Sequence, residues 1–230
     1  VGLILLASVV AAAAVWTFYN VKWNRRLARE IDNWKAVGLP LQVSEVIPAS
    51  PEAQRNAADI YLTVFNVDLN ADFDEANGGQ LRGLTPDDQR LLADFLKSAE
   101  RGRSTAEMRA LLRREEVVAT LDTLRRASLL PEAVFPIQWE HGFAAGFPHL
   151  NRFRDAARLV CCRALISVED GRPSEALDWC ATCIRMAGHA GDCPTLIGQM
   201  VANAMRGMAL RVVEGTVSGQ YTDASGRRML

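Results

Sequence analysis

The sequence predicts an all-α fold, with one N-terminal transmembrane helix followed by an irregular domain of TPR-like helical hairpins. Two observations predict this class. Residues 1–19 form an uncharged apolar run, and the rest of the chain carries repeated helix-start signals separated by short turns. With 230 residues, 49% of them hydrophobic and 23% charged, the chain is long enough for one anchored domain with its own core.

The apolar run (VGLILLASVVAAAAVWTFY) contains no charged residue and no proline. At about 1.5 Å per residue, a helix of this length matches a hydrocarbon layer of roughly 30 Å. A signal peptide would have a shorter apolar stretch followed by small residues, whereas this run leads into bulky aromatics. We therefore expect an uncleaved anchor rather than a signal peptide or a buried core helix. The predicted anchor residues are Leu3, Leu6, Val10, Val15, Trp16, Phe18, Tyr19 and Trp23.

The anchor helix is expected to continue beyond the bilayer. Residues 27–34 keep apolar side chains at spacings of three and four until Gly38 and Pro40 end the pattern, so residues 1–37 form the span and its extension. Four cations follow the aromatic belt, at the level of lipid headgroups: Lys22, Arg25, Arg26 and Arg29. We predict that Arg25 and Arg26 contact anionic headgroups or an acidic partner. A solvated helix face is the alternative.

Residues 38–150 are predicted to form a helical region. Helix-start signals stand at Ser50-Pro51-Glu52, Thr85-Pro86-Asp87 and Ser104 with Glu107. They predict helices over residues 50–65, 85–96 and 104–112, the last of which continues or restarts through Leu124.

Residues 131–150 (PEAVFPIQWEHGFAAGFPHL) break the helical pattern with three prolines and two glycines. We expect an ordered irregular segment whose aromatic side chains pack against the helices. Such a segment is also a place where a partner docks, and the candidate partner contacts here are Phe143 and Phe147.

Residues 151–230 are predicted to form a helical hairpin and a following helix. One helix ends near Glu169, residues 170–173 form a turn, a second helix runs through Met186 and a third covers residues 194–214. The third helix is no second span, because four polar side chains would enter the hydrocarbon: Gln199, Asn203, Arg206 and Arg211. Three small residues instead predict close packing: Gly198, Ala202 and Gly207. Residues 219–223 resemble a turn and cap before a further helix.

The hairpin resembles a tetratricopeptide repeat. Glycine, alanine and packing positions match at Gly171, Ala176, Leu177, Cys180, Cys183 and Ile184. Its first helix departs from the motif, because Val160 and Arg163 stand at the aromatic and leucine positions. The resemblance covers one repeat and part of its neighbour, and it implies a surface for binding other proteins.

The whole arrangement resembles a group of uncharacterised bacterial single-span membrane proteins. Their irregular helical domain contains an NAA-x-x-Y stretch, which stands here at Asn56, Ala57, Ala58 and Tyr61. The resemblance implies no activity. It implies an inner-membrane location with the domain on the periplasmic side, whereas the cations after the span argue for the opposite orientation.

The five cysteines allow several interpretations. Trp179-Cys180-Ala181-Thr182-Cys183 resembles the WCxxC of thioredoxin-like oxidoreductases, but it lies inside a predicted helix with no strand before it. Core packing is the first interpretation. The alternatives are a disulfide or thiol site at Cys162, Cys180 and Cys183, and a zinc site completed by Cys193 or His189. Adjacent Cys161 and Cys162 point about 100° apart on a helix, so only one of them can join such a site.

Other chemistry has weaker signals. Residues 68–74 (DLNADFD) alternate oxygen-bearing side chains as an EF-hand loop does, but Phe73 and Gly79 replace the required glycine and acid. No phosphate-loop, dinucleotide or hydrolase motif appears, so we expect no catalytic residue and no cofactor. The net charge of -1 and the pI of about 6.4 argue against a nucleic-acid partner.

Together these observations predict a non-catalytic, membrane-anchored accessory or scaffold subunit. Its partners would be the bilayer and integral membrane proteins of a larger bacterial complex. A sequence that starts without methionine and stops within a predicted helix is typical of a subunit inside an assembly, and the expected class is energy-transducing, respiratory or photosynthetic. The alternatives are a periplasmic thiol-redox or metal-binding protein that uses Cys180 and Cys183, and an anchored peptide-binding module.

Overall fold

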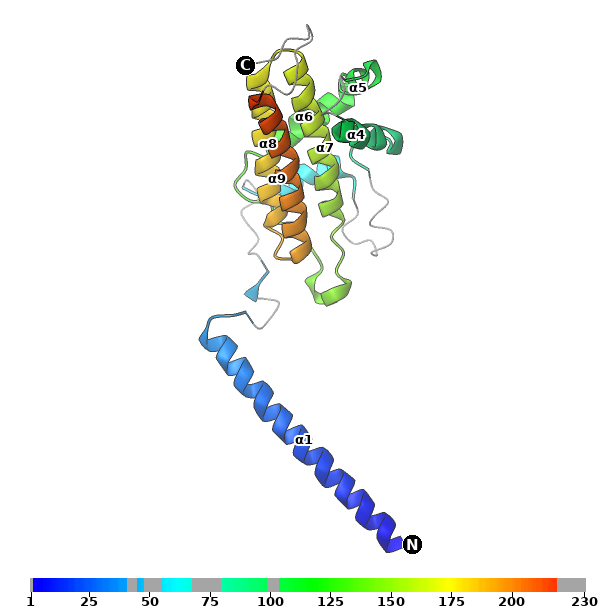
Figure 1. The fold of residues 1–230 in the computed structure, drawn as a ribbon, viewed down its shortest axis with the longest axis vertical. Helices are drawn as coiled ribbons and strands as arrows, with labels where there is room; N and C mark the ends of the chain where they lie inside the picture. Colours follow the sequence, from blue (N-terminus) through cyan, green and yellow to red (C-terminus); the bar gives the residue numbers. More distant parts are fainter. Residues whose placement is uncertain (1, 41–44, 48–54, 68–79, 99–103, 219–230) are drawn as a thin grey trace. The chain divides into compact units, whose positions relative to one another are not determined.

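A computed structural model describes residues 2–40, 45–47, 55–67, 80–98 and 104–218, without the side chains of residues 2–14, 143 and 144. Every regular element in these residues is a helix, which confirms the all-α prediction. The elements are α1 (Gly2–Ala36), α2 (Ala58–Phe65), α4 (Pro86–Ser98), α5 (Ala106–Leu111), α6 (Glu115–Ala127), the 3-10 helix η2 (Trp139–Ala144), α7 (Pro148–Glu169), α8 (Pro173–Gly191) and α9 (Leu196–Val217), shown in Figure 1. The chain divides into two units, residues 1–47 and 48–230.

The first unit contains α1, a single helix over the predicted span and its extension. It ends as the glycine signal predicts. Gly38 has a φ of 74°, its N–H donates to the Lys35 carbonyl at 3.0 Å, and the Leu39 N–H donates to the Trp34 carbonyl at 2.9 Å. This pair of bonds is a Schellman motif, which satisfies the last carbonyls of the helix.

The span itself stays a prediction. Within the described part of the chain, none of the helices combines the length with the apolar character that a membrane crossing needs. The side chains of Leu3, Leu6 and Val10, three of the predicted anchor residues, lie outside the described residues.

The second unit is built around three long helices, α7, α8 and α9, each of which packs on the other two (Figure 1). The turn between α7 and α8 lies at the predicted place. Gly171 has a φ of 74°, its N–H bonds to the Val168 carbonyl at 2.9 Å, and the Arg172 N–H bonds to the Ser167 carbonyl at 2.8 Å. This second Schellman motif reverses the chain, so α8 runs back along α7.

Only some positions of this hairpin are buried as the tetratricopeptide motif predicts. Ala176, Cys180 and Cys183 are buried as packing positions should be. Leu177 and Ile184 are 41% and 38% exposed and point away from the bundle. The tetratricopeptide-like packing therefore stays a prediction.

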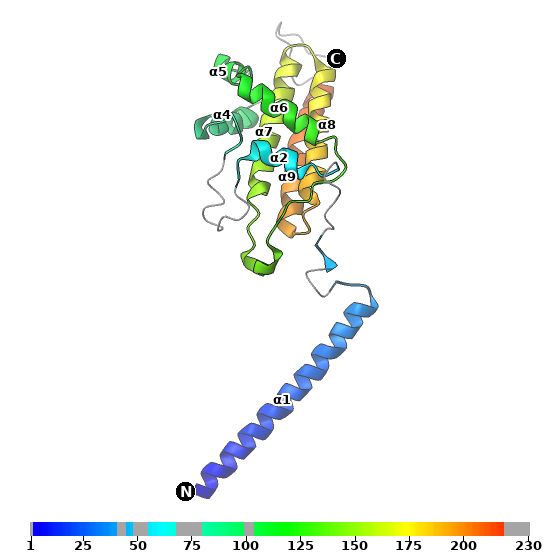
Figure 2. The ribbon, with the colours of Figure 1, turned by 180° about the vertical axis from the view of Figure 1, so that it is seen from behind.

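The shorter helices cover one side of the bundle. Figure 2 shows α2 and α6 crossing in front of α7 and α8, with α4 and α5 beside them. The start of α4 follows the predicted signal. The Thr85 N–H donates to Asp88 Oδ2 at 2.8 Å, and the Asp88 N–H donates back to Thr85 Oγ1 at 3.2 Å. These reciprocal bonds form a capping box with an aspartate as its acid.

Two predicted helix starts differ from the structure. The signal at Ser50-Pro51-Glu52 lies outside the described residues, but Arg55 to Ala57 are not helical, so a continuous helix over residues 50–65 is wrong. The capping residue of α5 is Thr105, whose hydroxyl accepts from the Met108 N–H at 3.1 Å. The capping box at Ser104 is wrong, because Ser104 donates instead to the carboxylate of Glu169.

The remaining boundaries follow the sequence closely. α5 and α6 are separate helices, so the helix restarts rather than continues. α7 begins at Pro148 within the segment expected to be irregular, and α8 extends beyond Met186 to Gly191. The predicted turn at residues 219–223 lies outside the described residues.

Candidate functional site

The described part of the predicted anchor exposes a row of large apolar side chains. Five of these anchor residues are more than half exposed: Val15 57%, Trp16 69%, Phe18 65%, Tyr19 54% and Trp23 60%. In water, this much apolar surface on one helix is unfavourable. At a membrane surface, we expect Trp and Tyr side chains to be followed by cations, which is the order found here.

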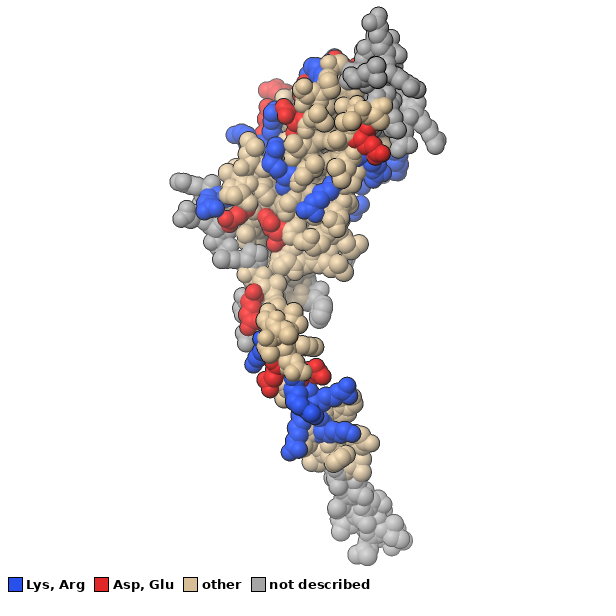
Figure 3. Space-filling model, turned by 60° about the vertical axis from the view of Figure 1, so that its left-hand side comes forward, with Lys and Arg blue, Asp and Glu red and all other residues tan. Residues whose placement is uncertain are grey.

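The cations of α1 lie immediately after these aromatics. Lys22, Arg25, Arg26 and Arg29 are all exposed, and Figure 3 shows a cluster of blue side chains on this helix. The Arg26 guanidinium lies 5.7 Å from the centre of the Trp23 ring, a cation–π contact. Arg25 and Arg26, the predicted partner contacts, are therefore accessible to headgroups or to an acidic protein.

The NAA-x-x-Y stretch has a structural role in the second unit. The side chain of Asn56 donates to the Val134 carbonyl at 3.0 Å and accepts from the Val134 N–H at 2.9 Å. Its Oδ1 also accepts from the Ala58 N–H at 3.1 Å, which starts α2. The Asn56 side-chain amide therefore satisfies both the N–H and the carbonyl of Val134, 78 residues further along the chain.

Tyr61 of the same stretch anchors α2 in the core. Its ring stacks on Phe65 with centroids 5.3 Å apart, and its hydroxyl lies 2.9 Å from His189 Nδ1. The other ring nitrogen of His189 lies 2.9 Å from the Leu130 carbonyl, so a neutral ring can accept from Tyr61 and donate to Leu130. Burial lowers the pKa of His189, which favours this neutral form. Both ring nitrogens of His189 are thus used in hydrogen bonds of the core.

Four of the five cysteines belong to α7 and α8, Cys193 follows α8, and all five are free and buried. Cys161 Sγ lies 3.8 Å from Cys183 Sγ. Cys162 points elsewhere, with its Sγ 3.6 Å from the Leu92 carbonyl. Of the adjacent pair, the structure therefore brings Cys161, rather than the predicted Cys162, next to Cys183.

The environment of these thiols disfavours thiolate chemistry. The hydrogen bond to Cys183, together with burial, raises the pKa of Cys161 well above its ordinary value. Burial raises the pKa of Cys180 to about 12 and raises that of Cys162 further. No group of His, Cys, Asp and Glu side chains among the described residues has the geometry of a metal site. A thiol that is buried and protonated is a poor nucleophile.

The end of the bundle where α7 meets α8 is closed by ion pairs; we call it the charged end. Glu169 accepts from the Ser104 N–H at 2.7 Å and from Arg109 Nη2 at 2.7 Å. Arg109 also binds Asp170 at 2.6 Å. Burial acts to raise the pKa of Asp170, but the hydrogen bonds from its two arginine neighbours lower it overall. Glu175 accepts from Arg163 at 2.8 Å, so the carboxylates of the charged end have cationic partners.

The opposite end, where α7 begins and α8 passes into α9, exposes apolar side chains; we call it the apolar end. Leu196, Ile197 and Met200 in the first turns of α9 are 77%, 53% and 62% exposed. Trp139 and Phe147 lie at the same end, half-buried, with ring centroids 5.8 Å apart. Figure 3 shows tan surface at the lower end of this unit, with the charged side chains higher up. The side chain of Phe143, the other predicted partner contact, lies outside the described residues.

The apolar end also contains buried polar groups without hydrogen bonds. Neither ring nitrogen of His149 has a hydrogen-bond partner, although the ring is stacked 4.2 Å from that of Phe135. Burial lowers the pKa of His149 to about 3. Arg152 Nη1 lies 3.1 Å from Asp155 Oδ2, which is close enough for an ion pair, but the two groups are not aligned for a hydrogen bond. Burial lowers the pKa of Arg152 and raises that of Asp155.

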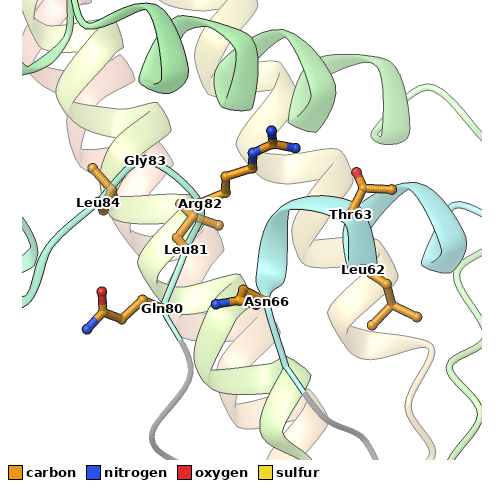
Figure 4. A pocket seen from close by; sticks show the side chains of 8 residues that line it. All are labelled: Leu62, Thr63, Asn66, Gln80, Leu81, Arg82, Gly83 and Leu84. Carbon is orange, nitrogen blue, oxygen red and sulfur yellow. The ribbon is translucent and has the colours of Figure 1, made fainter.

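Two hollows open on the described surface. One, of about 10 Å³, lies among Val134, Trp139, His149, Asp192 and Cys193, and has room for about one water molecule. The other, of about 450 Å³, lies between the end of α2 and residues 80–84 (Figure 4). Both of its walls lead directly into residues 68–79, the predicted calcium-like loop, which lies outside the described residues. We therefore do not assign a ligand to it.

Comparisons with known protein families, with curated proteins and with solved structures found no match. The resemblance to bacterial single-span membrane proteins therefore stays a prediction, as do the inner-membrane location and the absence of catalysis.

Sequence reasoning missed the contrast between the two ends of the bundle. The small residues of the predicted third helix indicated close packing in the domain, and Gly198 fits this because an added Cβ would lie 2.7 Å from the Cys193 carbonyl. Gly207 does not fit, because nothing lies within 4 Å of the same position. The lack of any Lys or Arg in residues 186–205 was the signal that could have identified the apolar end.

Proposed function

We propose that this chain is a non-catalytic accessory subunit, anchored in a bacterial inner membrane by α1, whose helical domain packs on integral membrane proteins of a larger complex. The energy-transducing complexes of respiration or photosynthesis are the proposed class. We propose the periplasmic side for the domain, as the predicted resemblance to bacterial single-span membrane proteins implies.

The observation that carries the proposal is the row of exposed aromatic and aliphatic side chains on α1, from Val15 to Trp23. A bilayer covers such side chains, and the indole and phenol rings then lie at the headgroup level. The exposed cations that follow can bind lipid phosphates. Together with the apolar run of residues 1–14, the residues up to Tyr19 give the length of 19 residues that a span needs.

The domain supports a structural rather than a chemical role. Its histidines at positions 149 and 189 are buried, and its thiols are buried with raised pKa values at Cys161, Cys162, Cys180 and Cys193. Nucleophilic and acid–base groups that act on a substrate must reach it. The exposed features are apolar side chains, which contribute to protein–protein contacts.

Affinity capture tests the proposal. The full chain with an affinity tag is expressed in its native membrane, extracted in a gentle detergent and purified. We expect integral membrane proteins to co-purify in a fixed ratio to the chain. Recovery of the chain alone, at several detergent strengths, would contradict the accessory-subunit role.

The side of the membrane needs its own measurement. Protease added to right-side-out spheroplasts is expected to digest the domain while a cytoplasmic marker stays intact. A domain that is digested only after the cells are broken would place it in the cytoplasm, as the cations after the span predict.

A further inference from the structure

The apolar end carries an unusual balance of side chains. Leu196, Ile197 and Met200 are all more than half exposed. Shortly before them in the chain, Pro194 lines the same small hollow as Trp139, whose ring lies 5.8 Å from that of Phe147. No Lys or Arg occurs in residues 127–151 or 186–205, the two segments that build this end. The exposed charges of these segments include Glu140 and Asp192, both acidic. The surface is therefore an apolar patch with an acidic rim.

The acidic rim favours one of three possible partners for the patch: lipid, a second copy of the chain, or another protein. Lipid headgroups of a bacterial membrane are partly anionic, and proteins that rest on them present Lys and Arg, which these two segments lack. A second copy of the chain would bring its own acidic rim against Glu140 and Asp192, which is repulsive. A protein surface with an apolar centre and a basic rim complements both features.

Residues of the second unit that follow soon after α1 in the chain belong to the same region of the domain as the apolar end. Asn56, near the start of the described part of this unit, pairs with Val134. Val134 in turn lies around the same small hollow as Cys193 and Pro194, directly before the exposed residues of α9. Residues 37–55 join α1 to Asn56, and they span at most roughly 65 Å when fully extended. A tether of this length keeps the apolar end at a high local concentration near the bilayer.

We propose that the apolar end, centred on Leu196, Ile197 and Met200, docks on an integral membrane protein through an apolar patch of that protein rimmed by Lys or Arg. This inference rests on the proposed accessory-subunit function and names the surface that performs it. The charged end takes no part, because its carboxylates already bind arginines of the same domain.

Site-specific photo-crosslinking tests the inference with the full chain in native membranes. A photoreactive benzophenone amino acid is placed at Ile197 or, as a control, at Leu177, which is 41% exposed near the start of α8. We expect position 197 to form an adduct with one integral membrane protein, the same one that co-purifies with the chain. Position 177 should form none.

Charge variants measure whether the apolar end is needed for binding, which crosslinking alone does not show. Met200→Glu should lower the yield of the co-purified protein about tenfold or more, because it places an unpaired charge in the apolar patch. Asp192→Lys should lower it several-fold by opposing a basic rim. Leu177→Glu should leave it unchanged. The thermal midpoints of all three variants are measured to show that each domain is folded.

Three outcomes would overturn the inference while the proposed function stands. They are adducts at position 197 with lipid only, adducts with a second copy of the chain, and a partner that still co-purifies fully with Met200→Glu. If instead no integral membrane protein co-purifies with the unmodified chain, the proposed function itself fails.

Discussion

The two ends of the α7–α9 bundle differ in how completely the chain satisfies its own side chains. At the charged end, Glu169 is partly buried and accepts from Ser104 and Arg109. At the apolar end, His149 is buried with no hydrogen bond, while Leu196 and Met200 are exposed to water. Polar groups left unpaired inside and apolar groups left outside both cost free energy. The charged end is thus satisfied by side chains of the same domain, whereas the apolar end is the surface that we propose docks on another protein.

The largest expected effect of a single substitution is at the charged end. Glu169→Ala should lower the free energy of unfolding by about 3 kcal/mol, because it leaves the Ser104 N–H and hydroxyl without their acceptor and leaves Arg109 with Asp170 alone. Chemical denaturation of the full chain in detergent micelles measures the change. The control is Asp87→Ala, which removes an ion pair to Arg90 whose side chains are 89% and 79% exposed, and it should change nothing measurable. Equal losses of unfolding free energy for the two variants would show that Glu169 contributes no more to stability than an exposed ion pair.

A second effect, somewhat smaller, tests the buried histidine of the apolar end. The pKa of His149 is lowered to about 3 by burial, so the unfolded chain binds a proton near pH 6.5 and the folded chain does not. Stability should therefore fall as the pH drops from 6.5 toward 3. At pH 5 this histidine alone should account for a loss of about 2 kcal/mol relative to pH 7.

The variant His149→Phe isolates this contribution. It keeps a ring stacked on Phe135 and removes the titrating group, so its unfolding free energy should depend about 2 kcal/mol less on pH between 7 and 5. His189, whose pKa is also lowered by burial, titrates in both proteins and cancels in the difference. Identical pH profiles for the two proteins would show that His149 is hydrated in solution.

The smallest effect is expected at the exposed residues of α9. Ile197→Gln should change the free energy of unfolding by less than about 0.5 kcal/mol, because the side chain is already 53% exposed. Met205→Gln on the buried face of the same helix is the control and should cost about 3 kcal/mol or more. If Ile197→Gln destabilised the domain as much as the control, the apolar end would be part of the core rather than a free surface.

The sequence predicted a helix boundary well where neighbouring residues alone form the interactions that end the helix. Gly38 and Gly171 both end helices because glycine takes a positive φ without strain, and neither needs a distant partner. Asn56 was wrongly placed inside a predicted helix and Ser104 at a predicted helix start, because their partners are Val134 and Glu169, far along the chain. A rule based on neighbouring residues contains no information about such contacts.

The candidate sites were harder to predict than the helices. The spacing of Cys161 and Cys162 shows that they point in different directions, but only the packing of α7 decides which of them meets Cys183. The apolar residues of α9 indicate a helix whether they face the core or the solvent. Exposure depends on which neighbours the fold brings to that face, and periodicity alone does not supply it.

The central claim is that α1 holds the chain in a membrane, and alkaline carbonate extraction tests it most directly. Membranes that contain the full chain are washed with carbonate and sedimented, in parallel with a variant in which Leu6→Arg and Val10→Arg place two charges in the predicted span. The account predicts that the unmodified chain stays in the membrane pellet and that the double variant is released into the supernatant. Release of the unmodified chain by carbonate would contradict the anchor.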